Sequence, residues 1–450
     1  MNQGPVARKE PAVDGPKQGA GRYSYIWRAL KHRNFRLFFS GQSVSLIGTW
    51  MTRVATSWLV YRLTGSAWIL GLVGFIGQFP AFLLAPFAGV WVDRLDRRTV
   101  LLWTQALAAA QSLLLAVLTL TKLITIWEIL VLSAFQGLIN AFDMPGRQAF
   151  LVQMVEDRQD LGNAIALNSS MVNMARLVGP SLAGPVIAGF GEGYCFLIDG
   201  LSYFAVIASL ALMRIKPLAK KPDLRASMLD QLREGWAYVS GSIPVRTILL
   251  LFALVSLMGI PYLVLMPIFA AKVLHGGPHT LGLLMGASGV GALVSAFSLA
   301  VRKTVLGLGK MIPIASIAFG AGLILFGLSH VMWLSMLMML VTGFGMMQGM
   351  AASNTIIQTV VPEDRRGRVM SYYTMALVGM TPFGSLLAGS LAHLLGAPHT
   401  VIITGSIVIL GGIWFASQLP AIHRAIHPIY QAMGIVPAAP IETVVEDAAG

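Results

Sequence analysis

The sequence predicts an all-α integral membrane protein with twelve transmembrane helices in two pseudo-symmetric bundles of six. The chain has 450 residues, of which 56% are hydrophobic and 11% charged, whereas soluble domains carry about 25% charged residues. Its mean hydropathy of +0.72 argues against a soluble enzyme. Long apolar segments recur along the chain, and landmarks of its first half return in its second half.

Each predicted span is long enough for the bilayer, which a helix of about 20 apolar residues crosses. The spans cover 35–61, 68–92, 100–121, 125–145, 163–189, 194–213, 245–271, 280–301, 311–329, 332–354, 368–394 and 399–419. The domains that follow are a disordered cytoplasmic tail at 1–34, the first bundle at 35–213, a cytoplasmic linker at 214–244, the second bundle at 245–419 and a cytoplasmic tail at 420–450.

Basic residues predict the orientation of these spans. Of 32 Lys and Arg residues, only Arg62, Lys122 and Lys272 fall in the loops that alternate to one side. Positive loops stay in the cytoplasm during insertion. Both termini are therefore expected to be cytoplasmic, and the net charge of +13 reflects topology rather than a nucleic-acid partner.

Internal similarity indicates a duplicated unit. Leu70-Gly71 recurs as Leu281-Gly282, and Ala183-Gly184 recurs as Ala388-Gly389. Gly179 likewise recurs as Gly384. Such repeats build two bundles around a shared pathway.

The linker between the halves contains an amphipathic pattern. Apolar residues recur there at helical spacing, at Leu229, Leu232, Trp236 and Val239. This predicts a helix on the inner membrane surface.

A charged turn follows the second span, from Gly89 to Arg98. It resembles the signature loop of the major facilitator superfamily of secondary transporters, and the fold expected from this resemblance is the major facilitator fold. The matching residues are Gly89, Asp93, Arg94, Arg97 and Arg98, while Asp96 replaces the usual glycine. The resemblance implies a gating role for the turn; the alternative is a basic cytoplasmic loop without a special role.

Further motifs resemble one branch of that superfamily, which includes the enterobactin exporter and macrolide efflux proteins. They are Phe35-Arg36, Gly41-Gln42, Met51-Thr52-Arg53, Trp58-Leu59-Val60, Pro145-Gly146-Arg147-Gln148-Ala149, Ala175-Arg176-Leu177 and Arg366-Gly367-Arg368-Val369-Met370-Ser371. The resemblance implies proton-driven export of a small molecule across a bacterial inner membrane, with the proton gradient as energy source and no cofactor. One duplicated chain is sufficient for the pathway, so a monomer is expected.

Arg53 is the most informative single residue, because a charge near the middle of a span is costly unless it faces a polar interior. Gln42, Thr49, Arg53 and Thr56 step by three or four residues and so share one helix face. We expect this face to line the pathway, where Arg53 contacts substrate or a coupling carboxylate; the alternative is a buried structural ion pair. Further pathway candidates are Gln78, Asn354 and Gln358.

Asp143 and Arg147 are four residues apart and can pair along one helix face. We expect them to form a gating network with the charged turn. Glu156, Asp157 and Asp160 in the following loop are expected to be solvated charges.

Arg176 precedes Gly179-Pro180 and Gly184-Pro185 on the fifth span. Glycines permit close helix contact and prolines bend a helix. A hinge or a packing seam is predicted at Gly179, Pro180 and Gly184 and at their repeats Gly384 and Gly389.

Asp199 is the first candidate for proton coupling, since burial and neighbouring charges can adjust when a carboxyl group binds a proton. Arg53 and Arg176 are the cations that could accompany it, and Glu128 is a weaker candidate. The alternative for Asp199 is a local hydrogen-bonding role near the outer interface.

The sequence contains no phosphate-binding loop and no metal-ligand pattern, so neither ATP hydrolysis nor a metal site is predicted. Two other functions remain open: a proton-coupled importer of a metabolite, and a non-transporting membrane receptor or assembly factor on the same fold.

Overall fold

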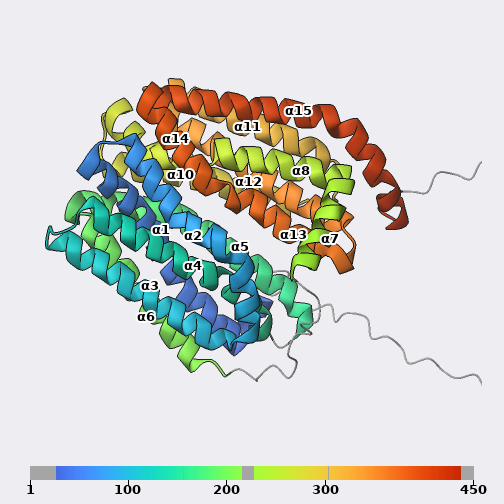
Figure 1. The fold of residues 1–450 in the computed structure, drawn as a ribbon, viewed down its shortest axis with the longest axis horizontal. Coiled ribbons are helices and arrows are strands. Elements are labelled where there is room, and N and C mark those ends of the chain that lie inside the picture. Colours follow the sequence, from blue (N-terminus) through green and yellow to red (C-terminus); the bar gives the residue numbers. More distant parts are fainter. Residues whose placement is uncertain (1–26, 156, 215–227, 303, 437–450) are drawn as a thin grey trace, which may run out of the picture.

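The computed structural model describes residues 27–155, 157–214, 228–302 and 304–436, and this part of the chain is helical without a β-strand. Its helices form two adjacent groups, and in Figure 1 the second group lies above the first. We call the side where both ends of the described chain lie the terminal side, and the side with the α1–α2 turn the loop side.

The first group contains the helices before the linker. They are η1 (Arg28–Lys31), α1 (Arg33–Thr64), α2 (Ala67–Arg94), α3 (Arg97–Leu120), α4 (Ile126–Met154), η2 (Arg158–Asp160), α5 (Leu161–Phe190) and α6 (Glu192–Leu212). Helix α1 packs against α5 and α6, α2 against α4, and α3 against α4 and α6. The chain turns sharply after α1 because Gly65 adopts a left-handed φ of 60° and Ser66 caps α2.

The second group follows the linker. It comprises α8 (Ile243–Leu254), η3 (Val255–Gly259), α9 (Tyr262–Ile268), η4 (Phe269–Val273), α10 (Pro278–Ala300), α11 (Leu308–Leu328), α12 (Met332–Val360), α13 (Glu363–Thr374), η5 (Met375–Gly379), α14 (Thr381–Leu395) and α15 (Ala397–Ala432). The segments η3, η4 and η5 are wide π-helical turns that join their neighbours into longer rods. Helix α12 packs against both α10 and α11, and α15 covers α11.

Helix α7 (Met228–Gly241) belongs to the predicted linker and packs against α13. Val239 is buried, whereas Trp236 is exposed and its ring lies 6.0 Å from that of Tyr372. Glu234 pairs with Arg368 of α13. The side chains of Leu229 and Leu232 lie outside the described residues, so only the second half of the predicted amphipathic face can be placed.

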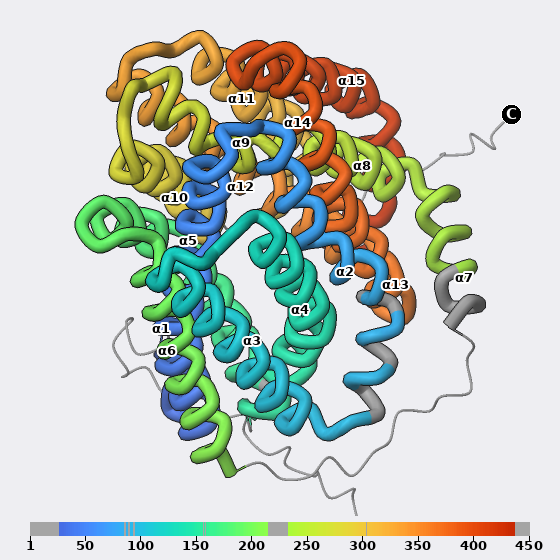
Figure 2. Tube along the Cα trace, turned by 60° about the vertical axis from the view of Figure 1, so that its left-hand side comes forward, coloured from blue at the N-terminus to red at the C-terminus, as the bar shows by residue number. Residues whose placement is uncertain are grey.

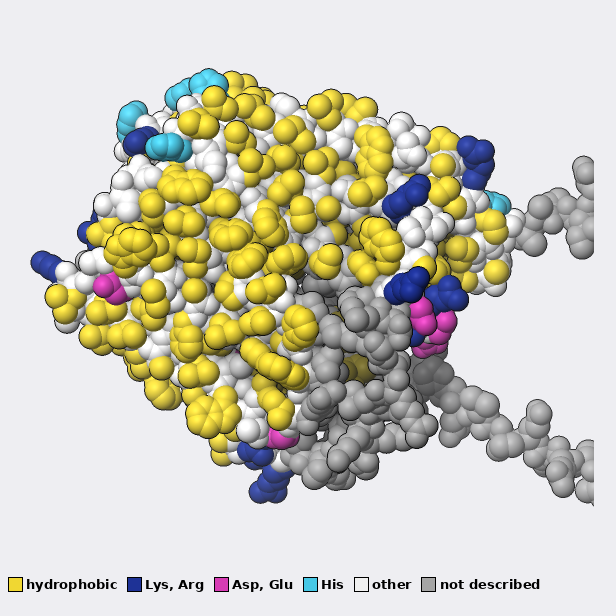
Figure 3. All heavy atoms as spheres, viewed as in Figure 1, with side chains coloured by type: hydrophobic (Ala, Val, Ile, Leu, Met, Phe, Trp, Pro, Cys, Tyr) yellow, Lys and Arg dark blue, Asp and Glu magenta, His cyan; other side chains and the backbone are white. Residues whose placement is uncertain are grey.

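Ten described helical segments are long and apolar enough to cross a membrane. Helices α1 and α5 have 32 and 30 residues and thus sufficient length, but they carry several polar and charged residues, including Arg53 and Arg176. The exact number of twelve spans therefore stays a prediction, as do the domain boundaries. Hydrophobic side chains cover most of the face seen in Figure 3, and charged ones lie near its margins, as lipid exposure requires.

The two bundles meet along two seams, α2 with α14 and α5 with α10, which Figure 2 shows from a second direction. At the loop side, a Cβ added to Gly71 would stand 2.8 Å from Gly389 Cα, and one added to Gly282 would stand 3.0 Å from Gly184 Cα. The duplicated glycines thus contact each other across the interface. Because only glycine permits such close backbones, these contacts seal the loop side of the molecule.

Candidate functional site

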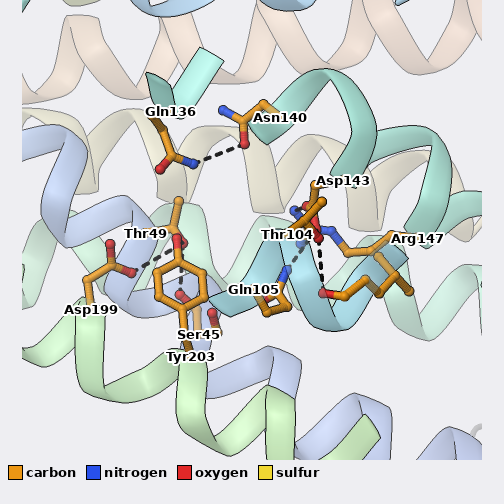
Figure 4. Close-up of polar contacts among 11 residues, drawn as sticks. Ser45, Thr49, Thr104, Gln105, Gln136, Asn140, Asp143, Arg147, Asp199 and Tyr203 are labelled. Atoms are coloured by element: carbon orange, nitrogen blue, oxygen red, sulfur yellow. Dashed lines mark hydrogen bonds and ion pairs between the residues drawn. The ribbon is translucent and has the colours of Figure 1, made fainter. Parts of the chain in front are cut away.

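A buried carboxyl group lies inside the first bundle, between α1, α3 and α6 (Figure 4). Asp199 is 1% exposed. Its Oδ2 accepts a hydrogen bond of 2.8 Å from Ser112, and its Oδ1 accepts one of 3.4 Å from Thr49. Among the described residues, no Lys, Arg or His nitrogen lies within salt-bridge distance of it. Asp199 is therefore held by neutral hydroxyl groups in the core.

A second carboxylate, Asp143, lies toward the terminal side of the same bundle. As its spacing predicts, it forms an ion pair with Arg147 on α4. Its Oδ1 also accepts hydrogen bonds from Thr104, at 3.0 Å, and Gln105, at 2.7 Å, both on α3 (Figure 4). This network ties α3 to α4.

A small polar cavity of about 20 Å³, which is room for a water molecule, is lined by Asp143 and by Thr49, a hydrogen-bond partner of Asp199. Gln42, Ser45 and Thr49 of α1 line it on one side. The face of α1 predicted to line the pathway therefore points partly into the first bundle. The residues that sequence reasoning missed here are Thr104, Gln105, Ser112, Gln136, Asn140 and Tyr203. Three of them sit on α3, and their helical spacing within an apolar span was a usable signal.

The structure describes the side chains of only part of the charged turn. The side chains of Asp93 and Arg94, and the surroundings of Gly89, lie outside the described residues. Arg97 donates a hydrogen bond of 3.1 Å to the Ala149 carbonyl of α4, and Arg98 donates one of 2.8 Å to the Ala211 carbonyl of α6. Both arginines thus join helices within the first bundle.

Asp96 explains why the usual glycine is dispensable at this turn. Its backbone has φ −67°, which every residue can adopt, and its side chain accepts a hydrogen bond from Thr99 N. Asp96 is therefore the N-cap of α3, a favoured position for aspartate.

The guanidinium groups of Arg53 and Arg176 both lie over the indole ring of Trp50. The Arg53 guanidinium carbon is 4.7 Å from the centre of the Trp50 ring, and that of Arg176 is 5.3 Å from it. Arg176 also faces the second bundle, within electrostatic range of Tyr262 on α9. Arg53 has an exposed side chain although it lies about 16 Å along α1 from its loop-side end, near mid-membrane depth.

The other pathway candidates have local partners. Thr56 is half-buried, Gln78 donates to Gly74 O of its own helix at 3.2 Å, and Gln358 donates to Asn354 at 3.0 Å along α12. Among the described residues, no hydrogen bond joins Gln78, Asn354 or Gln358 to Arg53.

The predicted glycine positions have two distinct surroundings. Gly179 packs against Trp50 and the Ile47 carbonyl within the first bundle. Its repeat, Gly384, packs against the Leu257 carbonyl within the second bundle. Gly184 and Gly389 instead lie in the seams between bundles, and the Pro180 carbonyl contacts Gly282 there. Gly179 and Gly384 thus pack helices within each bundle, whereas Gly184 and Gly389 pack the two bundles against each other.

Two acidic residues differ from expectation. Asp160 is 1% exposed and not a solvated loop charge, because Arg28, Lys31 and His32 surround it at 2.9, 2.7 and 2.9 Å. Hydrogen bonds from Lys31 and His32 lower the pKa of its carboxyl group.

Glu128 forms a capping box with Thr125 at the start of α4. This capping role explains a glutamate at position 128 without requiring that it take part in proton coupling. Among the described residues, no cluster of His, Cys, Asp or Glu could hold a metal ion.

Comparison with known proteins shows several relatives of similar length. The chain is 26% identical over 371 residues to the staphyloferrin A transporter of Staphylococcus aureus, covering 82% of this chain and 92% of that protein. It is 23% identical over 397 residues to macrolide efflux protein A of Streptococcus pyogenes, covering 84% and 95%. It is also 23% identical over 397 residues to the enterobactin exporter of Citrobacter koseri, covering 88% and 94%.

Solved transporter structures share the fold. A nucleoside transporter, NupG, superposes with a TM-score of 0.63 at 15% identity, covering 87% of this chain and 99% of that one. An inward-facing bacterial homologue of the lysosomal transporter Spinster gives 0.64 at 13% identity, covering 91% and 99%.

The family described as transmembrane secretion effector matches residues 24–450, nearly the whole chain. The predicted resemblance to the exporter branch is thereby confirmed, and with it a multi-pass membrane transporter rather than an enzyme. The chain belongs to the transmembrane secretion effector family of major facilitator transporters.

Proposed function

We propose that this transporter exports a small molecule in exchange for protons. The observation that carries the proposal is the interface between the bundles, which is sealed at the loop side by paired glycines and holds two arginines at mid-depth. Relatives whose names state efflux or export favour this direction. Siderophores, macrolides and other drugs are the substrate classes that these relatives suggest.

The transport cycle we propose is alternating access. The described state is closed at the loop side, so in this scheme the substrate enters from the terminal side. Rocking of the bundles would then separate α2 from α14 and α5 from α10. Both termini would lie in the cytoplasm of a bacterial cell, because the loop side carries few basic residues, and a single chain would form the pathway.

Asp199 is our candidate for the coupling proton. An ionised carboxylate that is away from water and has no direct ion-pair partner is costly, so changes in water access would move a proton on and off this group. A membrane potential contributes about 2.3 kcal/mol per charge per 100 mV. At about 1.4 kcal/mol per tenfold, one exchanged proton sustains roughly a fifty-fold substrate gradient.

The charged turn and the Asp143–Arg147 pair are our candidates for the terminal-side gate. The pair lies where α4 approaches that side, and Arg97 and Arg98 fix the neighbouring helix ends. When the bundles close there, Asp93 and Arg94 would meet the start of α13. Arg147 is half-buried and so remains available for a second partner.

Everted membrane vesicles with an imposed proton gradient test the direction of transport. A panel of siderophores, macrolides and other drugs is supplied outside, and accumulation inside the vesicles supports export. Depletion of a preloaded compound would instead support the importer. Purified chain in liposomes that moves no member of the panel under any gradient would favour the receptor or assembly factor.

A further inference from the structure

Two cationic side chains lie over one indole ring near mid-depth of the molecule, and neither forms an ion pair with a described acidic residue. Arg53 on α1 and Arg176 on α5 stack against Trp50 at 4.7 and 5.3 Å, and their like charges interact. Among the described residues, no Asp or Glu oxygen lies within salt-bridge distance of either one. Asp199 interacts electrostatically with Arg53, but its oxygens accept hydrogen bonds from Ser112 and Thr49. The pair therefore carries a double positive charge without a direct ion-pair partner among the described residues.

Arg176 also has hydrogen-bonding groups without partners. Its Nε and Nη1 atoms are buried and have no acceptor among the residues that the structure describes. Leaving buried donors unsatisfied is unfavourable, and more so when the group is charged. A structural arginine would be expected to satisfy them, as Arg62 does with Glu192 at 2.8 Å.

The location of the pair matches a transport site. Arg176 lies about 21 Å along α5 from its loop-side end and Arg53 about 16 Å along α1, so both are near mid-bilayer. Transporters of this architecture hold their substrate at that depth between the repeats. Leu177, the next residue on α5, contacts Gly289 of α10, which places Arg176 at the boundary with the second bundle.

We propose that Arg53 and Arg176 bind an oxyanionic group, a carboxylate or a phosphate, of the transported molecule. The planar guanidinium fork matches both groups through paired charge-assisted hydrogen bonds. An anion between the two arginines would satisfy the Arg176 donors and relieve the repulsion between the cations. This inference rests on the proposed transport function, and it restricts the substrate to compounds that carry an acidic group.

Binding to the purified full-length chain in detergent tests the site without any proton gradient. Citrate and inorganic phosphate serve as separate probes, with sodium chloride at equal ionic strength as the reference, and thermal unfolding is the readout. We expect at least one anion to raise the unfolding midpoint, and the stronger of the two identifies the group. Arg53→Gln and Arg176→Gln should each weaken this binding at least tenfold. Arg36→Gln, an exposed arginine near the start of α1, should leave it unchanged.

Stability without ligand distinguishes a binding role from a structural one. Because each substitution removes a repulsive charge, we expect the midpoint of Arg53→Gln and Arg176→Gln without anion to stay the same or rise. A clear fall in both would assign the arginines a structural role and overturn the proposal. It is also overturned if neither anion stabilises the parent chain, or if the stabilisation survives in both variants.

The outcome remains distinct from that of the export experiment. Anion binding that depends on both arginines supports the site even when vesicles show import. Export of a compound without an acidic group, at the same rate in both variants, would overturn the anion site and leave the export proposal standing.

Discussion

The seam between α5 and α10 allows a direct test of whether the loop side opens. A Cβ added to Gly282 would stand 2.6 Å from the Pro180 carbonyl oxygen and 3.0 Å from Gly184 Cα. Both neighbours are backbone atoms and cannot rotate away, so Gly282→Ala forces the two helices apart. Overpacking of this kind costs about 1–3 kcal/mol. If only the closed state bears this cost, the ratio of open to closed molecules rises about 5- to 150-fold.

Cysteine labelling can measure this shift. The only cysteine, Cys195, is buried, so Cys195→Ser gives a background without thiols. Ser385 is 1% exposed and faces Gly71 and Gly74 in the other seam, which makes Ser385→Cys a reporter of opening. An impermeant maleimide added to intact cells should modify this thiol faster by the same 5- to 150-fold factor when Gly282→Ala is present.

The matched control is Gly189→Ala on α5, where an added Cβ would meet nothing within 4 Å. Both variants gain the same helix propensity from alanine, so a difference between them reports the seam. Equal labelling rates in Gly282→Ala and Gly189→Ala would refute the idea that glycine contacts hold the loop side closed.

Three further predictions concern charged groups. Asp199→Asn should abolish the dependence of export on the proton gradient, as measured in everted vesicles. The control substitution Asp157→Asn, at an exposed residue, should leave this dependence intact. Gradient-dependent export by Asp199→Asn would show that this residue does not take part in coupling. Asp143→Asn should reduce the export rate at least tenfold, because Arg147 loses its ion-pair partner, and membrane insertion measured by immunoblot should be unchanged; a normal rate would exclude the gate. The contacts that lower the pKa of Asp160 stabilise the fold fully above the unfolded carboxyl value of about 3.9 and lose that effect as pH falls below it. Asp160→Asn should therefore raise amide exchange at Arg28–Lys31 roughly tenfold at pH 7 and by a smaller factor at pH 3. An equal effect at both pH values would contradict this interpretation.

The fold and several pairings could be predicted from the sequence because they depend on short spacings. The apolar segments identified the helices, and the i, i+4 spacing anticipated the Asp143–Arg147 pair. The duplicated glycines were visible as repeats. Their partners were not, since contact between Gly71 and Gly389 depends on how two distant bundles dock.

The remaining site features depend on side chains from several helices at once. Asp160 looked like a loop charge because its three cationic neighbours include residues more than 100 positions away. The hydroxyl groups around Asp199 come from α1 and α3, and no local pattern specifies that convergence. The capping box of Glu128, in contrast, is local, and its Thr-x-x-Glu pattern could have been recognised in the sequence.

The docking of each repeated glycine onto the non-equivalent glycine of the other half has an evolutionary consequence. After the duplication, position 71 became constrained by position 389, and position 282 by position 184, rather than each by its own copy. Substitutions that enlarge one member should therefore be rescued by reduction or displacement at its spatial partner. Across descendants of the ancestral gene, residue size should covary within the pairs 71/389 and 184/282, and the two pairs should drift independently of each other.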